Sequence, residues 1–302
     1  MKAVPSYSKI LTLGSSGTEN ALVGHVVVQE KVDGSQFAFG INEDGELVMR
    51  SKSVPMTVDN HAEMFDEAVD FVQSTAIVKL FKKEIYFYCE YLSKPKHNTL
   101  SYSKIPNNHL VLFDVLDTGK GFQDRYGIVS WARALDIDVI PELYAGRFER
   151  NQIDELLQKE SYLGGQKIEG VVIKNYEQNI ILGGNVFPLF TKYVSEAFKE
   201  KHSIDWKIRQ PKDTLENYIK GFKSEARWQK AIIHAKEKGI LTNSPKDIGP
   251  LLKFIQIDII EEEKENIKNH LYNCFYKDIM RHSVSGFPEW YKKKLLENLV
   301  TS

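Results

Sequence analysis

The chain has 302 residues, more than a typical single domain holds, which predicts one large domain with a smaller one beside it. Its hydrophobic share of 42% and charged share of 27% are those of a globular protein with ample material for a core. The formal net charge of −1 excludes nucleic-acid binding through overall charge, so any such contact must use local basic patches.

Alternating and β-branched apolar residues predict strands through the first two-thirds of the chain, and three-to-four-residue apolar spacing predicts helices between them. The tetrapeptide at 42–45, Asn-Glu-Asp-Gly, is a turn signal that joins two of these strands in a hairpin. Helices are expected from Asp59 or Asn60 to about residue 82, at 124–135 and at 152–163. The predicted strands are 25–28, 36–41, 46–50, 85–92, 109–115, 170–174 and 186–194.

The last third of the chain differs, because strand patterns stop near residues 201–210 and helical spacing continues from there. Proline-containing breaks at 244–245 and 286–288 divide it. The fold class is therefore α+β, with an antiparallel-sheet domain over residues 1–203 and a small all-α domain over residues 204–302. The predicted helices of the second domain are 215–222, 226–238, 248–282 and 289–299.

The cysteines and the apolar runs indicate the compartment. Cys89 and Cys274 lie far apart and have no metal-type spacing, as in a reduced intracellular protein. The N-terminus lacks a signal pattern, and no apolar run approaches the roughly 20 residues that span a bilayer. We therefore expect a cytoplasmic protein with no membrane contact.

The most informative segment is 30–36, Glu-Lys-Val-Asp-Gly-Ser-Gln, where Lys31 stands at a strand end before a sharp Asp33-Gly34 turn. Glycine lets the backbone bend there and lets a ligand approach closely. The pattern Lys-x-Asp-Gly alone arises by chance in roughly a few per cent of chains this long. A hairpin turn with an exposed lysine explains the segment equally well when it is taken by itself.

Charged residues also interrupt or end several apolar strands downstream. Glu90 and Asp114 each lie inside an apolar run, where a carboxylate is costly to bury without partners. Glu169 and Lys174 flank the apolar run 170–173, and Lys192 lies in the next strand. A solvated strand face is the simpler explanation of each residue alone. Only the order of these residues along the chain distinguishes a functional site from such a face.

This order resembles the motifs of the covalent nucleotidyltransferase superfamily, which contains ATP-dependent DNA ligases, RNA ligases and mRNA capping enzymes. The resemblance covers about residues 25–200 and is greatest to the RNA ligase 2-like group. It implies an adenylation domain that is ATP-grasp-like and built on antiparallel sheets. The helical C-terminal part agrees with this group, whereas DNA ligases and capping enzymes usually carry an OB barrel there. The motif residues, in chain order, are Lys31, Glu90, Phe113, Glu169 and Lys192.

The resemblance implies a role for each matching residue. Lys31 would attack the α-phosphate of ATP and carry AMP, Glu90 would bind the ribose, and Phe113 would stack on the purine. Glu169 would bind Mg²⁺ or Mn²⁺. Apart from the resemblance, the basic and polar loop 94–102, with Lys96 and His97, follows the Glu90 strand and would either touch substrate phosphates or lie as a solvated surface loop. Asp114 is expected to support the site. The full ATP-binding set is Glu30, Lys31, Gln36, Arg50, Glu90, Phe113, Lys174 and Lys192.

Two motifs depart from the family pattern. Close RNA ligase relatives often carry His and Asn where this chain has Asp33 and Gln36. An aspartate at position 33 is closer to the DNA ligase motif. The last motif usually holds two lysines, but only Lys192 is present here.

A lysine nucleophile must lose its proton from a pKa near 10.4. We expect Lys174, Lys192 and a bound Mg²⁺ to lower the pKa of Lys31.

The function implied is an ATP-dependent RNA ligase that joins RNA 3′-hydroxyl and 5′-phosphate ends through lysyl-AMP and RNA-adenylate intermediates. We expect it to act as a monomer. A DNA ligase or capping-type enzyme, and a catalytically silent nucleic-acid-binding relative, remain alternatives. The helical domain would engage the polynucleotide, or else serve as a structural cap or a partner-binding module. The lysines expected at such a contact are Lys220, Lys223, Lys230 and Lys236.

Overall fold

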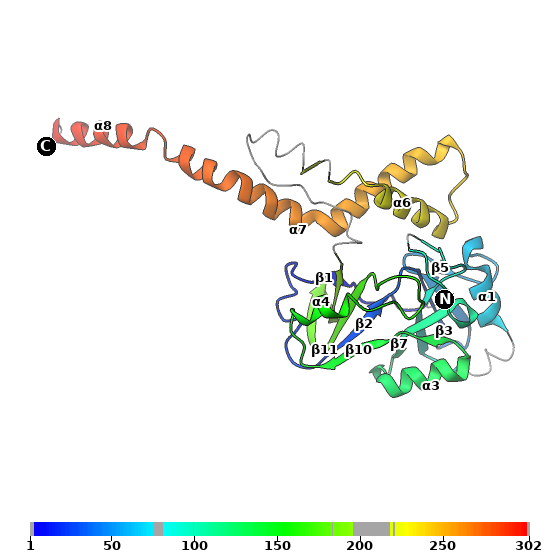
Figure 1. Cartoon of the computed structure of the whole chain (residues 1–302). Coiled ribbons are helices and arrows are strands. Elements are labelled where there is room, and N and C mark those ends of the chain that lie inside the picture. Colours follow the sequence, from blue (N-terminus) through cyan, green and yellow to red (C-terminus); the bar gives the residue numbers. More distant parts are fainter. Residues whose placement is uncertain are drawn as a thin grey trace.

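The computed structural model describes residues 3–74, 81–98, 100–182, 184–195, 218–219 and 221–300, with residues 182, 226 and 297–300 described by their backbone alone. Figure 1 shows a body of two mainly antiparallel sheets with short helices around it, followed by a helical C-terminal region. This confirms the predicted α+β fold class. The expected domain boundary at 203–204 lies outside the described residues, as do Lys220 and half of the predicted helix 215–222.

The first sheet has the strand order β1-β12-β11-β2-β10. Its strands are antiparallel except that β1 runs parallel to β12. Val28 and Ile173 lie opposite each other on β2 and β11 and are fully buried, and they pack with residues of α4 (Gln152–Leu156) in one apolar cluster. The strands are β1 (Leu11–Thr12), β2 (Val26–Lys31), β10 (Glu142–Gly146), β11 (Gly170–Leu182) and β12 (Asn185–Val194).

The second sheet has the order β5-β4-β3-β6-β7-β8, and β9 (Asp138–Val139) pairs in parallel with β7. Helices α1 (Asp66–Gln73) and α3 (Arg125–Leu135) cover one face of this sheet, where they share a buried aromatic cluster with β3 and β6. Its other strands are β3 (Ser35–Ile41), β4 (Leu47–Ser51), β5 (Pro55–Met56), β6 (Ile85–Tyr91), β7 (Leu110–Asp117) and β8 (Gly121–Phe122). Short 3-10 turns lie at Glu63–Phe65 and Asn107–His109.

The chain crosses from one sheet to the other directly after Lys31. Strand β2 ends at Lys31 in the first sheet, and β3 begins at Ser35 in the second, so residues 32–34 alone make the connection. A side chain at this crossing is supported by both sheets. The fold therefore places Lys31 where elements distant in sequence meet.

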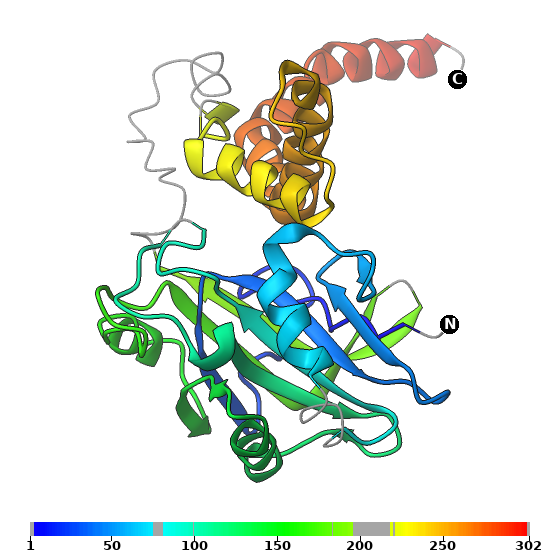
Figure 2. The ribbon, with the colours of Figure 1, turned by 90° about the vertical axis from the view of Figure 1, so that its right-hand side faces the viewer.

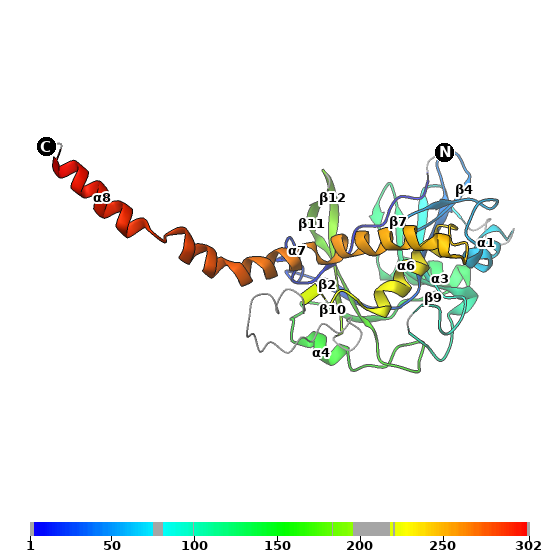
Figure 3. The same cartoon turned by 90° about the horizontal axis from the view of Figure 1, so that it is seen from above.

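The C-terminal region consists of α6 (Glu225–Glu237), a 3-10 turn (Pro245–Asp247), α7 (Ile248–Ser283) and α8 (Phe287–Val300). The Ser224 side chain accepts a hydrogen bond from the Arg227 amide and begins α6. Helices α6 and α7 pack together beside the sheet body, as Figure 2 shows. The second half of α7 and all of α8 extend away from the body in Figures 1 and 3. No helix in the described part of the chain is long and apolar enough to cross a membrane.

Two predicted helices are shorter than expected. The helix predicted to residue 82 is α1, which ends at Gln73, and residues 81–82 are not helical. Its N-cap is Phe65 without a side-chain bond, so the expectation of Asp59 or Asn60 as the cap was wrong. The helix predicted at 152–163 ends at Leu156, and Gly164 and Gly165, with positive φ angles of 73° and 85°, lie in a turn just beyond the predicted range.

Candidate active site

Lys31 lies in an ion pair at the junction of the two sheets. Its Nζ donates to Oε2 of Glu169 at 2.6 Å, and the two side chains are 26% and 15% exposed. Lys31 is the register partner of Gly170, so Glu169, which immediately precedes β11, stands beside the lysine. A Cβ on Gly170 would meet the Tyr193 carbonyl oxygen at 2.3 Å, which explains the glycine next to this carboxylate. The pair of strands thus brings together two predicted site residues.

The Asp33-Gly34 turn is held by the loop 93–102. The Asp33 carboxylate accepts a hydrogen bond from the Leu100 amide at 2.8 Å, and the Asp33 amide donates to the Tyr102 hydroxyl at 2.8 Å. Asn98 donates to the Gly34 carbonyl at 2.6 Å. A Cβ on Gly34 would lie 2.7 Å from the Tyr91 carbonyl oxygen, so the backbones approach too closely for another residue. These contacts fix the position of Lys31 two residues earlier.

His97 belongs to the same support. Its Nε2 lies 3.1 Å from the Ser35 hydroxyl, and its Nδ1 accepts a hydrogen bond from the Ser93 amide at 3.2 Å. Burial lowers the pKa of His97 to about 4, so the ring is neutral at pH 7. Lys96 beside it is exposed. His97 therefore supports the turn, and contact of either residue with substrate remains a prediction.

The charges around Lys31 act against the expected lowering of its pKa. Burial lowers the pKa of Lys31, but the carboxylates of Glu169, Asp33 and Glu90 outweigh it and the net shift is upward. Lys174 and Lys192 therefore do not lower the pKa of Lys31 as expected, whereas the effect expected of a bound Mg²⁺ stays a prediction. The physical reason is that the turn and β11 bring acidic groups to the Lys31 amine in addition to the positive charge of Lys192.

Glu90 lies opposite Gln36 on the β6–β3 pair, beside the turn. Burial raises the pKa of Glu90 to about 8; the Lys31 charge opposes this, whereas the charges of Asp33 and Glu169 add to it. A neutral carboxyl group near neutral pH can donate a hydrogen bond as well as accept one. Both predicted ATP-binding residues, Glu90 and Gln36, are thus near the Lys31 end of the site.

The raised pKa of Glu90 predicts a pH-dependent stability. A carboxyl group with a pKa of about 8 when folded holds its proton where the unfolded chain, with a value near 4.5, has lost it. The free energy of unfolding of the wild type should therefore fall as pH rises from 5 to 8. Glu90→Gln should remove this decline, on the order of 2 kcal/mol, after allowance for partial solvent screening. Thermal unfolding of both proteins between pH 5 and 9 measures the effect.

The control for this prediction is Glu155→Gln, at an exposed position on α4. It should follow the wild-type pH dependence. Parallel curves for the wild type and Glu90→Gln would contradict the prediction.

Glu30 and Arg50, both predicted to bind ATP, make internal contacts. The Glu30 carboxylate is buried and accepts from the Ser161 hydroxyl at 2.5 Å and from the Tyr162 amide at 3.1 Å. Arg50 donates to the Val4 carbonyl at 3.0 Å and to the Ser6 hydroxyl at 2.7 Å, which anchors the N-terminal segment to β4. A role for either group in nucleotide binding remains a prediction, because its observed partners belong to the protein.

Lys174 and Asp114 form a second, buried cluster beside the half-buried Phe113. Lys174 Nζ donates to Asp114 Oδ2 at 2.7 Å and to the Phe113 carbonyl at 2.8 Å, and the two charged side chains are 1% and 0% exposed. The hydroxyls of Tyr7 and Tyr176 also donate to Asp114, the second at 3.0 Å. The Lys174 amine lies 5.3 Å from the centre of the Phe113 ring. Lys174 is therefore fully engaged here, and its predicted phosphate contact has no support from this placement.

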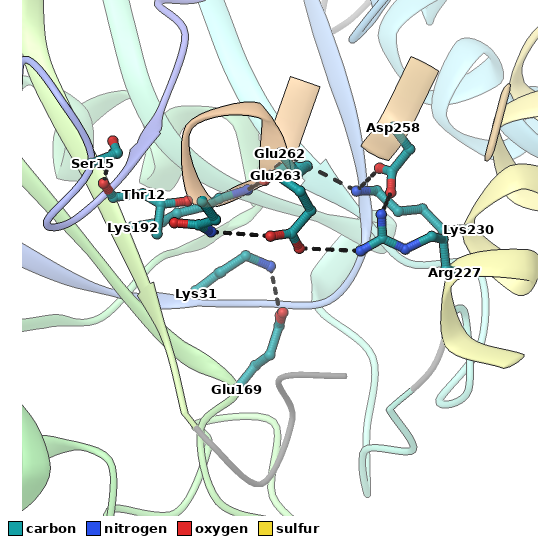
Figure 4. Close-up of polar contacts among 11 residues, drawn as sticks. Thr12, Ser15, Lys31, Glu169, Lys192, Arg227, Lys230, Asp258, Glu262 and Glu263 are labelled. Carbon is teal, nitrogen blue, oxygen red and sulfur yellow. Dashed lines mark hydrogen bonds and ion pairs between the residues drawn. The ribbon is translucent and has the colours of Figure 1, made fainter. Parts of the chain in front are cut away.

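Lys192 lies close enough to Lys31 for the two positive charges to act on each other. Its amine donates to both carboxylate oxygens of Glu262 on α7, at 3.0 and 2.8 Å. Figure 4 shows Lys31 with Glu169 on one side of this region and the acidic residues of α7 with Lys192 on the other. An acidic residue of the helical region thus reaches the predicted site.

Glu169 has the donor chemistry for a hard cation. Mg²⁺ commonly binds one or two carboxylates and completes its shell with substrate phosphates and water. Among the residues that the structure describes, no group of three or more histidine, cysteine or carboxylate side chains is arranged to hold a metal ion. Glu169 therefore fits the role of a single carboxylate ligand to a cation that binds together with a nucleotide.

The sequence profile of the RNA ligase family matches residues 24–194. This range is more than half of the chain and contains Lys31, Glu90, Phe113, Glu169 and Lys192. The chain belongs to the RNA ligase family. The family match begins before β2 and ends with β12, so it takes in both sheets of the body and stops before the helical region.

Solved structures resemble this RNA ligase family member more distantly. A Naegleria gruberi RNA ligase with PPi is 19% identical, with a TM-score of 0.46, over 66% of this chain and 58% of that one. A provisional ATP-dependent DNA ligase from Aquifex aeolicus is 15% identical, with a TM-score of 0.46, over 86% of this chain and 68% of that one. The matched region thus spans less than two-thirds of the Naegleria protein. The curated proteins include no match.

Sequence reasoning missed residues that support or cover the site. Asn98 and Tyr102 clamp the turn, Ser161 holds Glu30, and Glu262 contacts Lys192. Asn98 and Tyr102 lie in the same loop as Lys96 and His97. No local pattern marks Glu262, since acidic residues are common along α7.

Proposed function

We propose that this protein is an ATP-dependent RNA ligase that joins RNA 3′-hydroxyl and 5′-phosphate ends. Membership of the RNA ligase family supports the class of reaction. The observation that carries the proposal is the placement of Lys31, at a sheet crossing, 2.6 Å from Glu169 and close to Glu90 and Asp33. A fixed amine among groups suited to a metal–nucleotide complex is what lysine adenylation requires.

The first step forms a bond between Lys31 Nζ and the α-phosphorus of ATP and breaks the bond to pyrophosphate. The amine loses a proton and pyrophosphate carries away the electron pair of the broken bond. Lys31 is an ammonium paired with Glu169 in the nucleotide-free protein, so the amine must leave this pair and release its proton to water before it attacks. Lys192, whose charge acts on Lys31, is placed to stabilise negative charge on the phosphate oxygens.

The next two steps move AMP to the RNA and then release it. A 5′-phosphate oxygen attacks the lysyl-AMP phosphorus, and the Lys31 amine leaves and regains its proton. An RNA 3′-hydroxyl then attacks the activated 5′-phosphate, loses its proton and forms the phosphodiester, with AMP as the leaving group. Each step exchanges one phosphorus bond for another, so positioning and charge stabilisation carry the catalysis.

A divalent cation, Mg²⁺ or Mn²⁺, would be held by Glu169 with the nucleotide phosphates. When bound, it supplies positive charge that offsets the phosphates and the Glu169 carboxylate. Since the Glu169 charge is the largest influence that raises the pKa of Lys31, compensation of this charge favours the free amine. Glu90 and Gln36 beside the turn would contact the nucleoside, and Phe113 remains the proposed purine contact.

The test is incubation of the full chain with Mg²⁺ and ATP labelled at the α-phosphate, followed by a ligation panel. The proposal predicts a covalent protein label that survives denaturation and alkali but is lost in acid, as a phosphoramidate is, and sealing of a strand with a ribose 3′-hydroxyl end. Efficient sealing of deoxyribose ends alone would favour a DNA ligase, and labelling by GTP in place of ATP would favour a capping-type enzyme. Absence of any label would overturn the proposal and favour a silent binding protein.

A further inference from the structure

The helical region covers the proposed nucleotide site through several charged contacts. Glu262 of α7 binds the Lys192 amine with both carboxylate oxygens, at 3.0 and 2.8 Å. Glu237, at the end of α6, makes a side-chain hydrogen bond with Ser35, the first residue of β3. Its charge also acts on Glu90. Helices α6 and α7 therefore both touch the crossing that carries Lys31.

The two helices act as one unit because ion pairs join them. Arg227 of α6 lies 3.2 Å from Asp258 and 3.2 Å from Glu263 of α7, and Lys230 pairs with Asp258. We call α6 together with the first part of α7, residues 225–263, the hairpin. Glu262 differs from Asp258 and Glu263, whose cation partners lie on α6. Its closest cation is Lys192 of the body, at 2.8 Å, whereas Lys230 of α6 is 3.8 Å away. Figure 4 shows this separation of partners.

The Lys192 contact is substantial for an ion pair near a surface. The two side chains are 22% and 28% exposed, so water only partly screens their attraction. The charges of Lys192 and Lys230 outweigh burial and lower the pKa of Glu262 to about 2. Glu262 therefore stays ionised at every pH at which the protein would be assayed, and only a competing anion or a movement of the hairpin frees the Lys192 amine.

A carboxylate and a phosphate offer an ammonium group the same kind of oxygen acceptor. Lys31 must meet the α-phosphorus if the proposed function holds, and Lys192 is the neighbouring ammonium group that would meet the phosphate oxygens. We propose that the hairpin holds the nucleotide-free protein in a self-inhibited closed state, in which the Glu262 carboxylate occupies the phosphate position on Lys192. ATP must displace Glu262 to bind. This inference rests on the proposed function for the identity of the anion.

The first test compares the wild type with Glu262→Gln and Glu261→Gln. Glutamine keeps the size of the side chain but removes the charge that competes for Lys192, and Glu261 is an exposed neighbour on the same helix. Glu262→Gln should lower the ATP concentration for half-maximal lysyl-AMP formation by about three- to tenfold, as expected for one ion pair. Glu261→Gln should match the wild type. An unchanged or higher half-saturating concentration in Glu262→Gln would overturn the proposal.

The second test measures the hairpin position without any reaction. Spin labels on cysteines introduced at exposed Lys120, on the body, and at exposed Ile240, after α6, report the distance by pulsed electron resonance in a Cys274→Ser background. The wild type should give one narrow distribution, which Glu262→Gln or added inorganic pyrophosphate should broaden. Unchanged distributions in both conditions would overturn the closed state. This result stands even if no variant forms lysyl-AMP, so failure of the proposed function is distinguishable.

Discussion

Lys31→Ala is expected to abolish the covalent AMP label completely, since the phosphoramidate forms on the Lys31 amine and on no other group. Lys31→Arg should lose the label as well, because guanidinium keeps the positive charge but does not deprotonate in proteins. The arginine variant therefore separates nucleophilic attack from simple charge attraction. Labelling with α-phosphate-labelled ATP, followed by denaturing electrophoresis, measures both variants.

The matched control for Lys31 is Lys120→Ala, at an exposed position in the β7–β8 turn. It should retain wild-type labelling. The melting temperature of each variant shows that loss of label is not loss of fold, and only a small change is expected because Lys31 and Glu169 are partly exposed. Full labelling of Lys31→Ala would mean that another residue is the nucleophile, and the assignment of the site would fail.

Lys174→Met is expected to destabilise the protein by about 3–5 kcal/mol, because it leaves the Asp114 carboxylate buried without a cation. The hydroxyls of Tyr7 and Tyr176 would remain as hydrogen-bond donors to Asp114, but they carry no charge. Urea unfolding of the wild type and the variant measures the difference in the free energy of unfolding. Adding Asp114→Leu should recover part of the loss, since both charges are then removed together.

The control for the buried pair is an exposed one. Lys268 and Glu265 form an ion pair on α7 at 2.8 Å, with side chains 59% and 46% exposed. Lys268→Met should change the free energy of unfolding by less than about 1 kcal/mol. If Lys174→Met were as mild as Lys268→Met, the buried pair would not stabilise the fold. If folded Lys174→Met protein still forms lysyl-AMP, the residue is structural and its resemblance-based phosphate role is excluded.

The amino-acid sequence by itself determined seven strands of the body and the turn between two of them, but not the strands β1, β5, β8, β9 and β10. The turn at residues 42–45, between β3 and β4, formed as predicted, since Gly45 takes the positive φ of 88° that the turn requires. Helix α3 begins where Asp124 caps it, with a hydrogen bond from the Gly127 amide. These features depend on residues within a few positions of one another, so local chemistry is sufficient to predict them.

The placement of Lys31 at the end of a strand, before a glycine turn, was also predicted from the sequence. The residues that surround it were only partly predictable. The resemblance pointed to Glu169, Glu90 and Lys192, but it did not indicate that Lys174 would be buried against Asp114. Lys31 and Lys174 each stand at the end of an apolar strand segment in the sequence. Nothing local distinguishes a lysine whose amine reaches the site from one whose amine is buried in the core.

Tertiary structure decided the charge partners, and therefore the electrostatics of the site. Lys31 and Glu169 are 138 residues apart, and Lys192 and Glu262 are 70 apart, so strand register and the packing of α7 on the body select these pairs. The pKa of Lys31 rises for the same reason, because the fold brings three carboxylates to it. Local sequence sets which residue can react, whereas long-range packing sets the field in which it does so.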